Sequence, residues 1–305
     1  MLGRSGPTPI KVERRFPLDL HKSALAIRQL YETAKVERWS PEKDIQWESF
    51  DATAHEPGAR AAARRVWSRR AWIEYTGLAE TPALVIRFCL ERDREADPKY
   101  FLTVRNTEEA WHLECFHRYA EACGGYIERP DNAQWEPLFN QSLYRDALDA
   151  ELGIDGYVFT HCAFVDGLEC ELTRAWRDNA RDPVARAILD RCLVDRQRHA
   201  EFGWLYAQRR AAMLDDVQRA EVVSALVGHI EHVEFAGYSC VGLATVLDAT
   251  AEIADLAVVA QAGLGGISAD AEVELFADHL AESRVRLADL GVMLPLMHHA
   301  RLGAV

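Results

Sequence analysis

Two short segments of the chain place carboxylates and a histidine at helical spacing, and the segments resemble each other. The first contains Glu109 and His112, and the second contains Asp195, Arg196 and His199. Residues three positions apart on a helix share one face, about one turn apart. A carboxylate and an imidazole so placed can bind the same metal ion. The repeat therefore predicts a carboxylate–histidine metal site between helices.

Each segment is preceded by a further acidic residue at a nearly equal distance upstream. Glu80 precedes Glu109, and Asp166 precedes Arg196, as a duplicated helix pair would arrange them. The predicted metal ligands are Glu80, Glu109, His112, Asp166 and His199, with Arg196 at the sixth position. The sequence also leaves other ligands open: Glu74 in place of Glu80, Glu169 or Glu201 in the second half, and His232 or Glu234 farther along. For the segment around His232, a polar helix face is the simpler interpretation.

Arg196 changes the charge of the predicted site. A guanidinium group has only hydrogen-bond donors and stays protonated, so it cannot bind a cation. Four carboxylates would balance two divalent ions, whereas three carboxylates and one arginine leave a charge of about −2, which suits one ion. We therefore expect one well-formed site at Glu80, Glu109 and His112, or two sites of unequal affinity. We expect Arg196 to pair with Asp166 or to reach Glu109.

Helical patterns dominate the elements that must position these residues. A first helix is predicted at 20–37, and further helices at 60–92, 97–123, 142–178, 182–213, 215–237, 241–263 and 268–288, separated by Pro- and Gly-containing breaks. The predicted fold is all-α: an N-terminal arm and helix (1–59), a four-helix metal-binding bundle (60–213) and additional helices packed on the same domain (214–305).

This layout of acids and histidines resembles the ferritin-like di-iron carboxylate superfamily, which includes multicomponent monooxygenases, ribonucleotide reductase small subunits and N-oxygenases. The resemblance covers residues 60–213 and implies a four-helix bundle that binds iron, in one or two ions, or manganese, with O₂ as co-substrate. Two positions depart from the pattern. Asp166 replaces Glu, which still permits coordination, and Arg196 replaces a metal-bridging Glu, which puts ordinary di-iron chemistry in doubt.

The resemblance implies a non-haem iron or manganese oxidase or oxygenase that acts on a small organic metabolite in biosynthesis, with a reductase or other electron donor as a possible partner. Arg196 would then act in catalysis, by orienting a substrate carboxylate or stabilising an anionic oxygen. The alternative is a ferritin-like protein with a degenerate site, acting as a metal-independent enzyme or binding a ligand or partner. Iron storage suits the chain less well, because of its long arm and extra helices.

Composition limits the remaining possibilities. The formal net charge of −13 argues against broad binding of nucleic acids, which requires clustered Lys and Arg. Seven cysteines, an odd number without a CxxC pair, favour reduced thiols in the cytoplasm. The longest apolar stretch contains acidic residues and predicts a buried helix instead of a membrane span. We expect a monomer or homodimer.

Overall fold

The computed structural model describes residues 23–91, 94–141 and 143–305. Within them the chain is helical, apart from turns and one small antiparallel ribbon of β1 (His298–His299) and β2 (Gly303–Ala304). The predicted all-α fold is therefore confirmed. Among the described residues, no helix has both the length and the apolar character that crossing a membrane requires.

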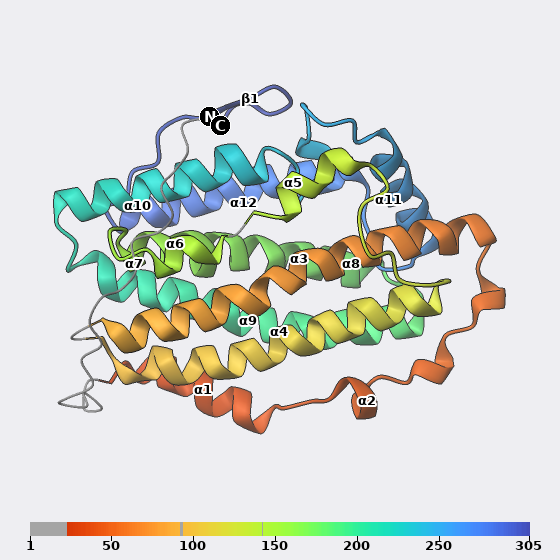
Figure 1. Ribbon diagram of the computed structural model, residues 1–305, viewed down its shortest axis with the longest axis horizontal. Helices are drawn as coiled ribbons and strands as arrows, with labels where there is room; N and C mark the ends of the chain where they lie inside the picture. The colour runs from red at the N-terminus through yellow and green to blue at the C-terminus, as the bar shows by residue number, and fades with distance from the viewer. Residues whose placement is uncertain (1–22, 92–93, 142) are drawn as a thin grey trace.

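The centre of the molecule is a bundle of four long helical segments (Figure 1). They are α3 (Pro57–Leu90), α4 (Ala96–Ala122), α8 (Asp166–Asn179) with the π-helical turns of η4 (Val158–Val165) before it, and α9 (Pro183–Ala211). Helix α3 packs along α4, and α8 packs along α9. The predictions for 60–92, 97–123 and 182–213 agree with these helices, although the end of the first lies outside the described residues.

The predicted helix at 142–178 is wrong in its first half. This segment forms α6 (Tyr144–Leu148), α7 (Ile154–Tyr157), η4 and α8. An extended residue, Gly153, caps α7 and separates it from α6. The wider π-helical turns of η4 change the direction in which later side chains point, and such turns are frequent at functional sites.

The N-terminal elements lie along the outside of α4 and α9. They are α1 (Leu25–Val36), α2 (Pro41–Asp44) and the 3₁₀ turns η1 (Trp47–Ser49) and η2 (Ala52–Ala54). The helix predicted at 20–37 thus begins at Leu25, and residues 20–22 lie outside the described part. Trp39, in the connection after α1, is buried and reaches the bundle core.

The C-terminal elements cover the opposite side of the bundle (Figure 1). They are α10 (Asp216–His229), the π-helical η5 (Ile230–Glu234), η6 (Val241–Leu243), α11 (Thr250–Ala262) and α12 (Ala269–Asp289). Two short elements, η3 (Ala133–Trp135) and α5 (Glu136–Phe139), lie in the connection between α4 and α6. The predicted helix at 241–263 begins only at Thr250. Gly242 approaches α12 so closely that a Cβ would lie 2.6 Å from the Ala269 carbonyl oxygen.

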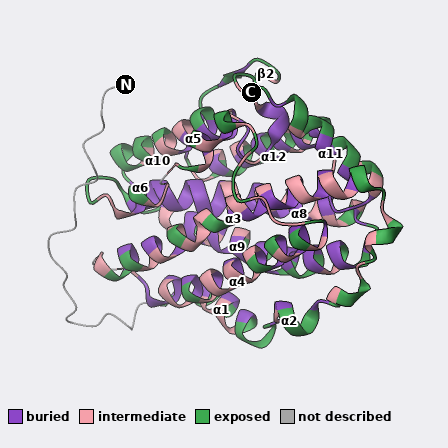
Figure 2. Ribbon diagram, turned by 45° about the vertical axis from the view of Figure 1, so that its right-hand side comes forward, coloured by how far each residue is buried: buried purple, intermediate pink, exposed green. Residues whose placement is uncertain are grey.

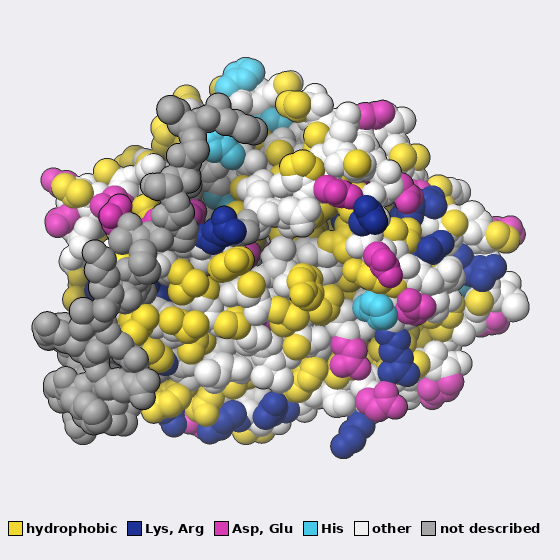
Figure 3. All heavy atoms as spheres, viewed as in Figure 1, with side chains coloured by type: hydrophobic (Ala, Val, Ile, Leu, Met, Phe, Trp, Pro, Cys, Tyr) yellow, Lys and Arg dark blue, Asp and Glu magenta, His cyan; other side chains and the backbone are white. Residues whose placement is uncertain are grey.

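Two apolar clusters fill the bundle, and the helices that contribute to them are buried on the faces that point inward (Figure 2). Trp67 and Phe116 belong to the larger cluster, and Phe88 and Phe101 belong to the smaller one. On α3, α4 and α9, buried charged residues lie in sequence between members of the two clusters. On one outer face, hydrophobic side chains lie in the middle and charged side chains gather toward the edges (Figure 3). The charged layer inside the bundle is therefore the unusual feature of the fold.

Candidate functional site: a buried carboxylate–arginine centre

Four helical segments contribute charged side chains to one small internal cavity of about 40 Å³, here called the inner cavity. Its lining contains five carboxyl groups and two guanidinium groups: Glu74, Glu80, Glu109, Asp166 and Glu169, with Arg105 and Arg196. His199 also lines it. Of the six predicted site residues, five therefore surround the same cavity, and the sixth, His112, is bonded to one of the lining carboxylates.

Arg196 connects two helices through their carboxylates. Its Nη2 donates to Oε2 of Glu74 on α3 at 2.5 Å, and its Nη1 donates to Oε2 of Glu169 on α8. Burial opposes the charge on Arg196, but Glu169 and Glu74 raise its pKa above the ordinary value. The prediction that Arg196 pairs with Asp166 or Glu109 is wrong, because its side chain leaves α9 toward the other two acids.

Arg105 on α4 makes a second connection of the same kind. Its Nε donates to Oε1 of Glu109 at 2.9 Å, and its Nη2 donates to Oδ1 of Asp166 at 2.9 Å. Although burial opposes the charge, Asp166 and Glu109 are among the groups that raise the pKa of Arg105 well above its ordinary value. Thr81 on α3 also donates to Oε1 of Glu109, at 2.9 Å. Two arginines thus link four carboxylates across the bundle.

His112 lies between two acids and is held in its charged form. Its Nδ1 is 3.0 Å from Oε1 of Glu74, and its Nε2 is 3.0 Å from Oδ2 of Asp195. Burial opposes the charge, but Cys192, Asp195 and Glu74 raise the pKa of His112 well above its ordinary value. The Nε1 group of Trp39 donates to the same Asp195 oxygen at 2.8 Å. The imidazole nitrogens are therefore occupied by carboxylates.

His199 occupies the matching position on α9 but remains neutral at pH 7. Its Nε2 lies 2.8 Å from Oε2 of Glu108, and burial lowers its pKa to about 4 despite this partner. Arg198 donates to Oε1 of Glu108 at 2.8 Å and also to Asp195. Each of the two predicted histidine ligands is thus hydrogen-bonded to an acid on another helix, His112 to Asp195 and His199 to Glu108.

Glu80 and Glu109 hold protons more tightly than ordinary carboxyl groups. Burial, together with the neighbouring Glu109, raises the pKa of Glu80 to about 8. Burial also raises the pKa of Glu109 to about 7, against the opposing effect of Arg105. The buried Oε2 atom of Glu109 has no hydrogen-bond partner among the described residues. The inner cavity therefore contains two carboxyl groups that carry protons near neutral pH, and one of them, Glu109, has an oxygen without a partner among the described residues.

The inner cavity adjoins a wider pocket of about 570 Å³ between η4 and α10, here called the outer pocket. Leu143, His161 and His229 line both of them. His161 stacks on Tyr157 with ring centroids 4.1 Å apart, and its Nδ1 lies 3.8 Å from Oε2 of Glu80. A small molecule in the outer pocket would therefore reach Glu80 past His161.

A two-metal cofactor does not fit this arrangement. Among the described residues, no three His, Cys, Asp or Glu side chains are placed so that they could hold a metal ion. Instead, Arg196 and Arg105 each join two carboxylates from different helices. The guanidinium groups bring positive charge and directed N–H donors into the same layer. Of the predicted ligands, Glu109 and Asp166 are bonded to Arg105. His112 and His199 are instead bonded to carboxylates.

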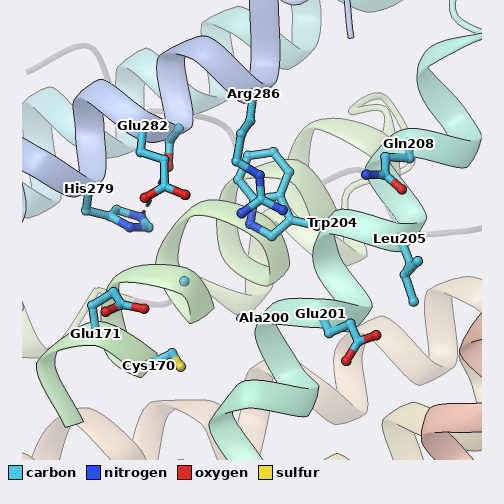
Figure 4. Close-up of a pocket in the computed structure, with 12 residues that line it drawn as sticks. Cys170, Glu171, Ala200, Glu201, Trp204, Leu205, Gln208, His279, Glu282 and Arg286 are labelled. Carbon is cyan, nitrogen blue, oxygen red and sulfur yellow. Dashed lines mark hydrogen bonds between the residues drawn. The ribbon is translucent and has the colours of Figure 1, made fainter. Parts of the chain in front are cut away.

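The structure also settles the alternatives among neighbouring acids. Glu74, and not Glu80, contacts His112. Glu169 lines the inner cavity, whereas Glu201 does not and is exposed. Glu201 lines a separate groove between α8, α9 and α12 (Figure 4). Glu234 is buried and lies 3.2 Å from Nε2 of His229, so the polar-face interpretation fails there, while His232 is exposed as that interpretation expects.

The residues missed by the sequence predictions are Arg105, Glu108 and Asp195. A usable signal existed for Arg105, since it precedes Glu109 by four residues and shares its helix face. Asp195 and Glu108 each precede a residue of the repeat directly. Their role as partners of the two histidines depends on contacts between helices, so local spacing gave no sign of it.

Comparison with known proteins places the fold. No family model matches the chain, and no curated protein resembles it in sequence. Among solved structures, an R2-like ligand-binding oxidase with an aerobically reconstituted metal cofactor matches with a TM-score of 0.67 at 17% identity, covering 85% of this chain and 92% of that one. An R2-like ligand-binding oxidase with an aerobically reconstituted Mn/Fe cofactor also matches, with a TM-score of 0.67 at 18% identity, covering 85% of this chain and 92% of that one. The chain therefore has the fold of these oxidases, which confirms the predicted ferritin-like bundle.

Proposed function

We propose that this chain binds a small organic molecule at the inner cavity and acts on it by proton transfer, without a resident metal cofactor. The carrying observation is that Arg105 and Arg196 link the carboxylates of the centre in pairs, while Glu80 and one oxygen of Glu109 remain directed to the cavity. This is the metal-independent alternative expected from the sequence, now with specific residues.

Glu80 and Glu109 would be the acid and the base. Adjacent carboxyl groups with different proton affinities can donate one proton and accept another at neutral pH. The pKa values of about 8 for Glu80 and about 7 for Glu109 suit this task. Arg105 and Thr81 hold the Glu109 carboxyl in place, and Gly77 allows it to lie against α3, where a Cβ would approach its Cδ to 3.3 Å.

Arg196 would be a positioning residue instead of the catalytic residue expected from the sequence. Both of its Nη groups are bonded to carboxylates, so they are not available to orient a substrate carboxylate. It would affect the reaction by holding the carboxyl groups of Glu74 and Glu169 in fixed positions in the cavity lining.

The test compares metal content with ligand binding. Protein loaded anaerobically with Fe(II) or Mn(II), then desalted, should retain well below one metal ion per chain by elemental analysis. Chelator-treated protein should bind fragments of a small-molecule set at the inner cavity as well as untreated protein does, as observed by NMR. Retention of two metal ions per chain, with ligand binding lost after chelation, would refute the proposal.

The second candidate is the metal-dependent oxidase predicted from the resemblance, with iron or manganese and O₂. Two observations favour it. The chain shares the fold of R2-like ligand-binding oxidases, and an acid is hydrogen-bonded to Nε2 of each of His112 and His199. It requires Arg105 and Arg196 to release their carboxylates. The same elemental analysis distinguishes the two candidates, because only the oxidase needs a bound metal.

A further inference from the structure

Acidic side chains belong to the lining of the outer pocket, through which the inner cavity is approached. The described lining of the outer pocket includes Glu151 and Glu221, and it contains no Lys or Arg. Clefts lined by one sign of charge raise the local concentration of oppositely charged small molecules. A cation is therefore favoured, and an anion disfavoured, before either reaches the inner cavity.

The inner cavity favours a cation as well, because a positive charge beside Glu80 and Glu109 would lower their raised pKa values and stabilise their ionised forms. Its lining carries five carboxyl groups against two guanidinium groups. Both guanidinium groups already donate to Glu74, Glu109, Asp166 and Glu169. An anionic ligand would therefore meet acids and find no free arginine Nη group, whereas a cationic group could contact the unpartnered Oε2 of Glu109.

Unpartnered hydroxyl groups mark where the rest of a ligand would lie. Tyr157 in α7 and Thr160 in η4 both line the outer pocket, and their buried hydroxyl groups have no hydrogen-bond partner among the described residues. Buried polar groups normally have partners, so these two are available to a polar ligand. The Tyr157 and His161 rings, stacked at 4.1 Å, also offer an aromatic surface beside Glu80.

We propose that the ligand of the inner cavity is a small organic cation, an amine whose ammonium group lies between Glu80 and Glu109 and whose carbon skeleton extends into the outer pocket. This inference rests on the proposed function and adds the chemical class of its substrate. Benzylamine, benzyl alcohol and benzoate form a suitable probe set, because they have similar shapes and carry a positive, zero and negative charge at neutral pH.

Binding of the three probes is measured by NMR titration of metal-free protein. Benzylamine should bind at least tenfold more tightly than benzyl alcohol, and benzoate should not bind detectably. The isosteric Glu80→Gln variant should weaken benzylamine binding at least tenfold, and Glu201→Gln, in the groove away from the site, should leave it unchanged. Circular dichroism establishes that each variant remains folded.

A second variant tests the position of the carbon skeleton. Gly228 lines the outer pocket, and a Cβ there meets no atom within 4 Å, so Gly228→Phe fills the pocket without a backbone clash. It should abolish benzylamine binding, and Gly228→Ala should retain it. Equal effects of the two variants would overturn the placement in the outer pocket.

The outcomes separate this inference from the proposed function. Benzyl alcohol or benzoate binding at the cavity as tightly as benzylamine would overturn the cation assignment and leave metal-independent binding intact. Mn²⁺ alone, bound at one ion per chain and competing with benzylamine in a Glu80-dependent manner, would show that the cation is a metal and overturn both. Absence of binding by all three probes would overturn the cation assignment.

Discussion

Replacement of Arg196 by methionine should destabilise the protein strongly, because the guanidinium group is the bond between α3 and α8 at the centre. The variant keeps side-chain bulk but leaves Glu74 and Glu169 without their cation. Removing one partner of a buried ion pair typically costs about 3–5 kcal/mol. The pKa of Glu74, lowered to about 2 by Arg196 and His112 against the effect of burial, agrees with a stabilising contact in the folded protein.

The size of this effect should depend on pH in a defined direction. In the wild type, the depressed pKa of Glu74 contributes stability that is present above about pH 4.5 and is lost as pH falls toward 2. Without Arg196, burial favours a protonated Glu74, so the variant tolerates acid better than neutral conditions. The difference in the free energy of unfolding between wild type and Arg196→Met should therefore shrink between pH 8 and pH 5.

Urea unfolding followed by circular dichroism measures this difference, with Arg65→Met as the matched control. Arg65 also makes a two-bond contact to a carboxylate, with both Nε and Nη2 within 2.6 Å of Asp255, but its side chain is 42% exposed. Such pairs are worth about 1 kcal/mol or less. A loss below about 1 kcal/mol in Arg196→Met, or one that grows toward pH 5, would show that Arg196 is not a buried structural cation.

Three further predictions concern the centre and its support. Double substitution of Arg105→Leu and Arg196→Glu should raise the iron or manganese retained per chain, by elemental analysis, and no gain over wild type would show that arginine does not exclude metal. Glu80→Gln should reduce the loss of unfolding free energy that the wild type shows as pH rises, measured by urea unfolding. The raised pKa of Glu80 contributes stability that is present below about pH 4.5 and is lost as pH rises through about 8. The same dependence of unfolding free energy on pH in variant and wild type would contradict this. Gly203→Ala should cost about 3 kcal/mol or prevent folding, because a Cβ would lie 1.7 Å from a carbonyl oxygen of η4, and Gly58→Ala, with open space around it, should be near neutral in the same urea assay.

The sequence by itself determined the helical architecture and the region of the site. Helix periodicity and breaking residues are local signals, so α3, α4 and α9 agree with their predicted ranges within a few residues. The repeated spacing of Glu109 with His112 and of Arg196 with His199 also indicated helix faces that lie at the inner cavity. Local signals did not predict the correct helix boundaries where π-helical turns occur, as in η4, or where the backbone makes a close contact, as at Gly242.

Only the tertiary structure decided which charges meet. Successive side chains on a helix are rotated by about 100° about its axis, so Glu74 and Glu80 point in different directions from the same helix. Sequence distance alone could not show which of the two contacts His112. Arg196 was identified as a missing carboxylate, but its pairing with Glu74 and Glu169, and the parallel pairing of Arg105 with Glu109 and Asp166, arise from contacts between helices. Because a charge buried in a bundle must be neutralised by whatever neighbour the packing supplies, the nature of the centre is a property of the folded arrangement.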